Sequence, residues 1–503
     1  MDTAFATRFR QVMSDLSASQ QTYIPRNDFA SDERSINLAE ATCPWPSPPK
    51  ARLLIEVALR IASGCFHIVR KSCVLDAVEM SHSNSSSNQI PTWKDYSVKG
   101  KIWALFAMGE LYSSRTTRAD HDFPGLHYFA KATKILNYLG ERPTMDLLET
   151  RLILSLYSLA VNRQYAAYTL VGSSVRMAII MGLHISITPD QLDDAAVREH
   201  RTRLWWTAHV MDCLFSSRLG HRPTVHEDDI KASLPREIEA AEATSADFSD
   251  ASYFTANAKL SVIMTRIICS VYGSPTGSGN LSERVKQALD DLSLWTRDLP
   301  PELHSENTTT SKRCNLGLVY LRLTLNQAVI LSTRPILLYG LRNIWTTAKP
   351  STGPHGVQSI RGNQSAMLLI ESCVRCARHS CSTLIQSWID GLFPAFDPFL
   401  TQHLFSALTI LAISSLFSEN ESGKDREQLE QSAQLLSQLK DGGNFVAQEL
   451  HQHVGAILAG LIEIQSWQSC CATNSESNKA VATSLRYKSF SGSQTWICSS
   501  LTH

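Results

Sequence analysis

The sequence lacks an excess of basic residues, because its 47 lysines and arginines are balanced by 47 aspartates and glutamates. It also lacks a basic block, since the pair Lys312-Arg313 near a loop is far too short to be one. A protein whose main task is to grip nucleic-acid phosphates normally shows one of these features. On electrostatic grounds, the chain as given is a poor DNA binder.

An export signal and a membrane span are missing as well. The first two dozen residues have no apolar core of the kind a signal peptide needs. The longest apolar run, near 404–417, is interrupted by Ser and Thr and is too short to cross a bilayer. The twelve cysteines are therefore expected to be reduced thiols of a cytosolic or nuclear protein, with no membrane partner.

Catalytic motifs are absent too. The sequence contains no G-x-G-x-x-G, P-loop, G-x-S-x-G or H-E-x-x-H pattern. Terpene synthases, which are all-α enzymes, need an aspartate-rich motif to hold magnesium on a diphosphate. The pairs Asp193-Asp194, Asp228-Asp229 and Asp290-Asp291 each lack the third carboxylate. The chain is therefore not expected to be an enzyme, and no catalytic or cofactor-binding residue is assigned.

What the sequence does contain is helical periodicity. Apolar residues recur three and four positions apart, and no alternating strand pattern is present. These helices are predicted near 51–71, 101–114, 126–140, 147–160, 256–272, 281–303, 316–338, 365–387, 398–417, 427–439 and 443–466. Short connections between successive helices predict an all-α fold, a large multi-helix domain of packed helical hairpins with flexible termini.

The most informative stretch runs from Tyr165 to Pro235. Its first part places Tyr168, Val171, Val175 and Ala178 on one helical face, and its second part repeats the pattern with Leu204, Ala208, Met211 and Phe215. Gly182 is predicted to end the first helix, since glycine enters the left-handed conformation cheaply. Gly172 lies inside that helix, where a close helix crossing would justify it. Together the two parts predict a helical hairpin.

This stretch resembles the fungal-specific transcription factor domain, the regulatory middle region behind the zinc binuclear cluster of Zn2Cys6 activators. The residues that carry the resemblance are Gly172, Arg176, Met177, Ala178, Gly182, Leu183, His184, Glu199, Arg201, Arg203, Trp205, Trp206, Asp212, Gly220 and Pro235. They are spaced as in the family over some seventy residues, and most of them are expected to be structural. One departure is the turn Gly220-His221-Arg222-Pro223, where the family usually has Gly-Arg-Pro.

The resemblance implies a nuclear fungal transcription regulator that controls a metabolic or biosynthetic gene set. This chain would supply the helical regulatory domain, with a homo- or heterodimer partner and a small-molecule effector as the implied partners. The family's six-cysteine zinc cluster is not in the sequence, so no DNA-binding or metal-binding residue is assigned. DNA would then be reached indirectly or through a missing N-terminal domain. The alternative is a metabolite-sensing or scaffold module that binds no DNA.

Five segments are expected. Residues 1–50 end in a proline-rich stretch and form a flexible lead-in, and 51–345 form the regulatory domain. Residues 346–364 are a linker or loop, 365–470 are a C-terminal helical part that packs on the same core, and the Ser-rich residues 471–503 are a disordered tail.

Several residues that suggest chemistry have a simpler structural interpretation. Cys373, Cys376, His379 and Cys381 fall in one helical pattern with no second cysteine group, which favours packing over a metal site. The run 226–229 is expected to be a solvated turn. Trp205 is expected in the core, with Trp206 at its edge. His184 is expected to be a helix-terminal hydrogen-bonding residue, and His451 and His453, two apart on a helix, are poor co-ligands.

Overall fold

The structure is a computed structural model of the chain. It describes residues 1–17, 24, 43–83, 92–117, 123–139, 141–238, 247–248, 250–273, 280–304, 316–347, 364–415 and 422–474. Within these residues it contains 16 α-helices and no strand, which confirms the predicted all-α fold. The single isolated β-bridge among them joins Ile185 to Lys231.

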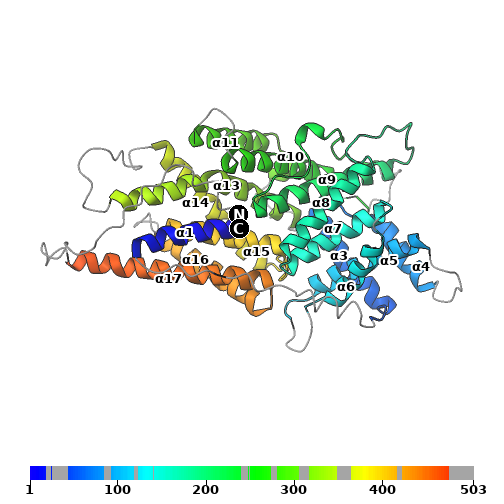
Figure 1. Cartoon of the computed structure of the whole chain (residues 1–503), viewed down its shortest axis with the longest axis horizontal. Coiled ribbons are helices and arrows are strands. Elements are labelled where there is room, and N and C mark those ends of the chain that lie inside the picture. Colours follow the sequence, from blue (N-terminus) through cyan, green and yellow to red (C-terminus); the bar gives the residue numbers. More distant parts are fainter. Residues whose placement is uncertain are drawn as a thin grey trace.

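The helices lie in an elongated arrangement in which α3 to α9 occupy one end and α13 to α17 the other (Figure 1). The first end contains α3 (Pro48–Cys65), α4 (Lys71–Ser83), α5 (Trp93–Ser113), α6 (Leu126–Tyr138), α7 (Met145–Ala160), α8 (Gln164–Ile180) and α9 (Ala195–Leu219). The rest comprises α10 (Ala251–Ile267), the π-helical turn η3 (Ile268–Tyr272), α11 (Leu281–Arg297), α12 (Pro301–His304), α13 (Leu316–Thr347), α14 (Gln364–Ile389), α15 (Pro398–Ser414), α16 (Ser422–Asp441) and α17 (Phe445–Asn474).

Side-chain caps mark where several helices begin. Thr92 and Asp95 form a reciprocal capping box at the start of α5, and Asn280 and Glu283 form another at the start of α11. Each box satisfies amide donors that have no partner inside the helix. The carboxylate of Asp397 accepts hydrogen bonds from the first amides of α15. These boundaries are therefore encoded within three or four residues of sequence.

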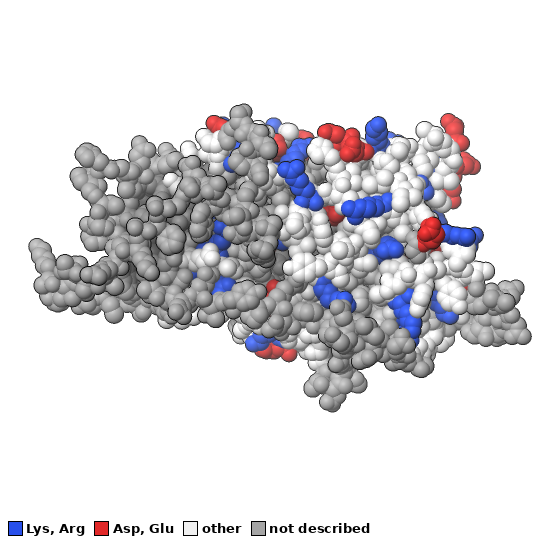
Figure 2. All heavy atoms as spheres, viewed as in Figure 1, with Lys and Arg blue, Asp and Glu red and all other residues white. Residues whose placement is uncertain are grey.

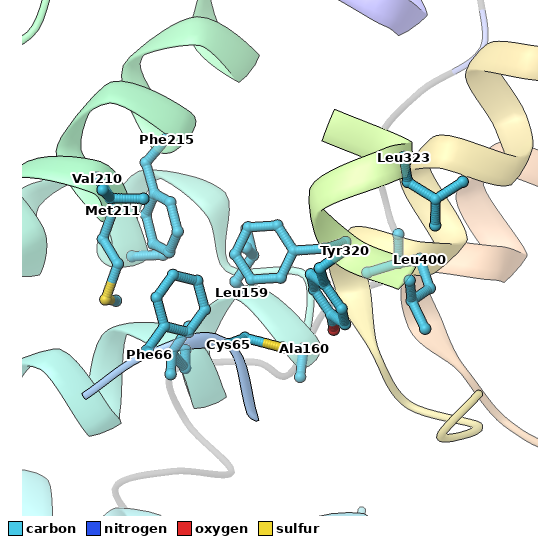
Figure 3. Close-up of a cluster of buried hydrophobic side chains, with 14 of the residues drawn as sticks. Cys65, Phe66, Leu159, Ala160, Val210, Met211, Phe215, Tyr320, Leu323 and Leu400 are labelled. Atoms are coloured by element: carbon cyan, nitrogen blue, oxygen red, sulfur yellow. The ribbon is translucent and has the colours of Figure 1, made fainter. Parts of the chain in front are cut away.

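One hydrophobic core joins the two ends of the molecule. Figure 3 shows the junction, where Phe66 after α3, Phe215 of α9 and Tyr320 of α13 converge, with Leu400 of α15 beside them. The Tyr320 ring lies 6.3 Å from Phe399, whose ring is 5.9 Å from Phe66. Helices from the C-terminal part therefore share a core with those of the N-terminal part.

The prediction of a flexible lead-in is wrong for residues 2–17, which form helix α1 (Asp2–Ser17). Its apolar face, with Phe5, Phe9 and Met13, is buried, and the helix packs against α17 and α15. Asp2 at its start forms an ion pair with Arg334 of α13. The three apolar residues are four apart, a signal that the polar composition around them conceals. The remaining lead-in residues, apart from Ile24 and 43–50, lie outside the described residues.

The helix predicted near 316–338 is longer than expected, because α13 continues through Pro335 to Thr347. Proline has no amide hydrogen, so the carbonyl four residues earlier, that of Leu331, loses its helical donor. The hydroxyl of Tyr272 donates to this carbonyl at 2.6 Å. A tyrosine from η3 thus replaces the missing donor, and the helix persists.

The predicted linker and tail fall largely on residues outside the description, which are 348–363 and 475–503. The described ends differ from the predicted boundaries, since α17 reaches Asn474. Two segments, 251–272 and 316–341, are long and apolar enough to cross a membrane by length and composition. Their apolar windows are 50% and 72% buried inside the fold. Packing against neighbouring helices therefore accounts for their composition.

Candidate functional site

The predicted hairpin is present as α8 and α9. Gly182 follows α8 with a φ of 69°, and Gly220 ends α9 with a φ of 77°, the left-handed conformation expected of glycine after a helix. Asp194 caps α9 by accepting from the amide of Val197 at 2.9 Å. Gly172 behaves differently from expectation. A Cβ there would lie 3.5 Å from Arg176 Nη1, an ordinary contact, so no close helix crossing requires this glycine.

A buried ion pair lies near the start of α9. Arg203 is fully buried, and its Nε donates to Oε1 of Glu199, one turn earlier, at 2.6 Å. The same carboxylate oxygen accepts from the amide of Arg236 at 3.0 Å, while Arg203 Nη2 donates to the Arg236 carbonyl. Burial raises the pKa of Glu199, and the bonds to Arg203 and to the Arg236 amide oppose that rise. The pair thus fastens the connector after α9 to the helix.

The two tryptophans occupy the predicted places. Trp205 is fully buried, with His184 at 5.8 Å and His209 at 6.3 Å between ring centroids. Trp206 is 8% exposed, and its Nε1 donates to the carbonyl of Ser233 at 2.8 Å. The spacing in the sequence indicates the same division between core and edge. His184 differs from expectation, because its ring Nδ1 has no hydrogen-bond partner among the described residues, while its carbonyl accepts from the amide of Lys231.

Asp212 organises the turn that departs from the family pattern. Its carboxylate accepts from the Thr224 amide at 2.5 Å and from the Thr224 hydroxyl at 3.1 Å. Burial raises the pKa of Asp212, and these two hydrogen bonds oppose the rise. The turn at 220–223 has one residue more than the family pattern. It is nevertheless followed directly by a residue that the Asp212 side chain of α9 holds in place.

Several other residues of the resemblance make local contacts. Arg201 donates to the Met181 carbonyl at 3.0 Å, and the Pro235 carbonyl accepts from the Thr255 hydroxyl at 3.3 Å. Arg176 is exposed. The buried members of this group are Met177, Ala178, Leu183 and Pro235. Met177, Ala178 and Leu183 belong to the hydrophobic core that the hairpin shares with its neighbours.

A buried polar chain beside the hairpin has no signal in the sequence. Lys101 Nζ lies 2.7 Å from Glu149 Oε2, and Glu149 Oε1 lies 2.8 Å from His200 Nε2. The other nitrogen of His200 is 2.9 Å from His67 Nε2. Burial alone would raise the pKa of Glu149, but Lys101 and His200 together hold it below its usual value. The members come from α5, α7, α9 and the α3–α4 connection, so spacing along the chain could not reveal them.

An open cleft of about 570 Å³ lies against the hairpin. It is formed by α9, the connector after it, α10 and α11, and its lining residues are Trp206, Glu227, Asp228, Ile230, Ala232, Leu234, Ala258, Lys259, Val262, Ile263, Arg266, Asp291, Leu294, Trp295 and Asp298. The run 226–229 was expected to be a solvated turn, and η2 (Glu227–Asp229) is indeed exposed. Sequence reasoning missed that this turn forms one rim of a cleft.

The cysteine group of α14 does not fit a zinc cluster. Cys373 and Cys381 are fully buried, and burial raises the pKa of each thiol to about 12 and that of Cys376 to about 11. Burial therefore favours the neutral thiol at each of these positions. In the described part of the chain, no group of three His, Cys, Asp or Glu side chains is placed to hold a metal ion. These cysteines pack against neighbouring helices.

The surface gives no sign of a phosphate-binding face on the side that Figure 2 shows. Lys and Arg side chains are scattered among uncharged residues there, and Asp and Glu lie mostly toward the edges of the described surface. The described part of this face carries no continuous basic band.

Comparison with known proteins agrees with this geometry. Residues 60–300 match the Fungal specific transcription factor domain, a range that includes the hairpin and the whole cleft lining. An uncharacterized transcriptional regulatory protein of Schizosaccharomyces pombe is 27% identical over 56% of this chain and 34% of its own length. The Activator of stress genes 1 of Saccharomyces cerevisiae is 24% identical over 48% and 27%.

A third similar protein is the thiamine repressible genes regulatory protein thi1 of Schizosaccharomyces pombe. It is 21% identical over 45% of this chain and 29% of its own length. The chain spans about a third or less of the length of these three relatives. The matched domain belongs to transcription factors and not to enzymes. With its helical hairpin, its spaced motif and its match to the family model, the segment 60–300 of this chain is a fungal-specific transcription factor domain.

Proposed function

We propose that this chain is the regulatory part of a nuclear fungal transcription regulator that controls a metabolic or biosynthetic gene set. The observation that carries the proposal is the family match over residues 60–300. The name of the thiamine-related relative supports a metabolic gene set. The helical domain would respond to a small effector and pass that signal to the transcription machinery, as part of a homo- or heterodimer.

Electrostatics support an indirect route to DNA. The chain has no net charge, and in its described part no group of three His, Cys, Asp or Glu side chains, those of α14 included, is placed to hold a metal ion. DNA reading would then belong to a segment preceding Met1 or to a dimer partner, and any zinc would be held there. An electrophoretic shift assay on the purified chain at several salt concentrations tests this point. Tight, sequence-specific binding by this chain alone would contradict it.

A reporter assay tests the regulatory role. The chain is fused to an unrelated DNA-binding domain and expressed in a fungal host, and the reporter is read across different carbon, nitrogen and vitamin supplies. The expected result is activation or repression in at least one condition, lost in the Trp205→Ala variant and retained in the Asp290→Asn variant. Asp290 is exposed on α11, so it is the matched surface control. A silent reporter in every condition would favour a sensing or scaffold module with no role in transcription.

A further inference from the structure

We propose that the cleft beside α9 binds a small organic cation with a flat apolar body. Its volume of about 570 Å³ lies in the range of small-molecule sites, roughly 300–1,000 Å³. A three-turn α-helix is 10–12 Å across with its side chains and would need on the order of 1,500 Å³. The size of the cleft therefore selects a small molecule over a helix from a partner protein.

The apolar part of the lining selects a flat body. The indole nitrogens of Trp206 and Trp295 already donate to the Ser233 and Ala256 carbonyls. The rings therefore have no donor left for a ligand and contribute apolar surface. Leu294 lines the same cleft although it is 52% exposed. A ligand that covers this side chain removes apolar area from water, which favours binding.

The charged residues that line the cleft favour a positively charged ligand over a negatively charged one. Glu227 is bound by Arg266 through two hydrogen bonds of 2.6 and 3.0 Å, so these two charges largely cancel. The remaining charged members of the lining are Asp228, Asp291 and Asp298 against Lys259. A cleft lined by an excess of one charge attracts ligands of the opposite charge. Trp206 and Trp295 also line the cleft, and a cation is attracted to the face of an aromatic ring.

A bound ligand would touch parts of the hairpin that are fastened to the core. Trp206 belongs to α9, and the connector that forms one wall is held by Asp212 at one end and by Glu199 at the other. A ligand that prefers one arrangement of this connector would shift its population. Only this last step, which makes the ligand an effector of transcription, rests on the proposed function.

The test compares three probes that share one phenyl body: 2-phenylethylamine, 2-phenylethanol and phenylacetate. Isothermal titration calorimetry on the purified full chain measures each affinity at pH 7. The amine is expected to bind most tightly, the alcohol less tightly and the acid least tightly. The affinity of the amine should exceed that of the acid by at least about tenfold. Equal affinities for amine and acid, or no amine binding at millimolar concentration, would overturn the proposal.

Variants locate the site. The double change Asp291→Asn with Asp298→Asn is expected to weaken amine binding about fivefold and to leave alcohol binding unchanged. Asp290→Asn is the matched control, since Asp290 lies on the same helix and does not line the cleft. Val262→Trp fills the cleft and should abolish binding of both amine and alcohol, with circular dichroism confirming the fold. An equal loss in the Asp290→Asn control would place the effect outside the cleft.

The proposed function and the ligand proposal can fail separately. If the reporter responds to nutrients while the purified chain binds no amine, the cation proposal alone is wrong. If the amine binds as described while the reporter stays silent, the ligand proposal is supported and the proposed role in transcription is contradicted.

Discussion

The α8–α9 hairpin and the junction between α1 and α13 are both buried and both contain an arginine ion pair, yet they are specified differently. In the hairpin, Arg203 pairs with Glu199 four residues away. At the junction, Arg334 pairs with Asp2, 332 residues away in the chain. Arg334 also lies 4.7 Å from the Phe5 ring centroid and 5.4 Å from that of Tyr272.

The difference teaches which buried polar groups a sequence can reveal. The partners in the hairpin share a helical face, so helical periodicity is enough to place them side by side. The partners at the junction meet only because α1, η3 and α13 pack together. A buried ion pair stabilises little by itself, but loss of one partner leaves a charge buried without compensation. The two regions should therefore respond to mutation by different mechanisms.

The largest effect is expected from the core of the hairpin. Trp205→Ala should lower the free energy of unfolding by about 4 kcal/mol, because it removes a fully buried large ring and leaves a cavity. Chemical denaturation measures the loss. Trp205→Phe is the matched control and should cost clearly less, since the indole Nε1 has no hydrogen-bond partner among the described residues. Equal losses in both variants would mean that ring volume is not what matters.

Disruption of the junction between α1 and α13 should lower the free energy of unfolding by about 3 kcal/mol. Arg334→Met removes the ion-pair partner of Asp2 and the cation held between two aromatic rings. Calorimetry measures the change, and limited proteolysis should cut α1 faster. Arg297→Met, at an exposed position on α11, is the control and should change stability by less than about 0.5 kcal/mol. Unchanged proteolysis of α1 in Arg334→Met would show that the junction does not hold that helix.

The two ends of the molecule can also be compared by how stability depends on pH. Burial lowers the pKa of His209 in α9 to about 4 and that of His453 in α17 to about 4. The unfolded chain, with a histidine pKa near 6.5, binds more protons between these values, so stability is lost as pH falls from about 6.5 toward 4.

His209→Gln should remove about 1–2 kcal/mol of the stability loss between pH 7 and pH 5, measured by denaturant titration at each pH. His453→Gln should flatten the same dependence, because one core joins the two ends. A dependence that splits into two separate transitions would show instead that the ends unfold independently.

The smallest effect concerns the proline within α13. Tyr272→Phe should lower the free energy of unfolding by about 1–2 kcal/mol, since the Leu331 carbonyl and the Arg334 Nε lose their hydrogen-bond partner. In a Pro335→Ala background the cost should fall by about 1 kcal/mol, because the new amide hydrogen can reach the Leu331 carbonyl. A double-mutant cycle measures this coupling. Additive losses would mean that the hydroxyl does not replace the missing helix donor.

Much of the hairpin could be predicted from the sequence, while the cleft and the buried polar chain could not. Gly182, Asp194 and Gly220 act on backbone groups within a few residues, so local pattern suffices. The cleft takes its walls from four segments. The buried polar side chains that connect Lys101 to His67 likewise come from four segments. No spacing rule relates residues that far apart.

The two differences from the expected fold have the same origin. Local composition favours a flexible segment at residues 2–17, yet the buried face of α1 finds α17 and α15. Pro335 favours the end of a helix, and a hydroxyl 59 residues before Leu331 supplies the donor. In both places a distant partner outweighs the local preference.

By itself, the sequence determined the all-α class, the hairpin and its resemblance to a regulatory domain, because helical periodicity and glycine caps depend on near neighbours. Only the tertiary structure decided the α1 junction, the continuity of α13 and the acidic cleft. These features depend on which helix faces meet in the shared core, and that is settled by burial of apolar surface across the whole chain.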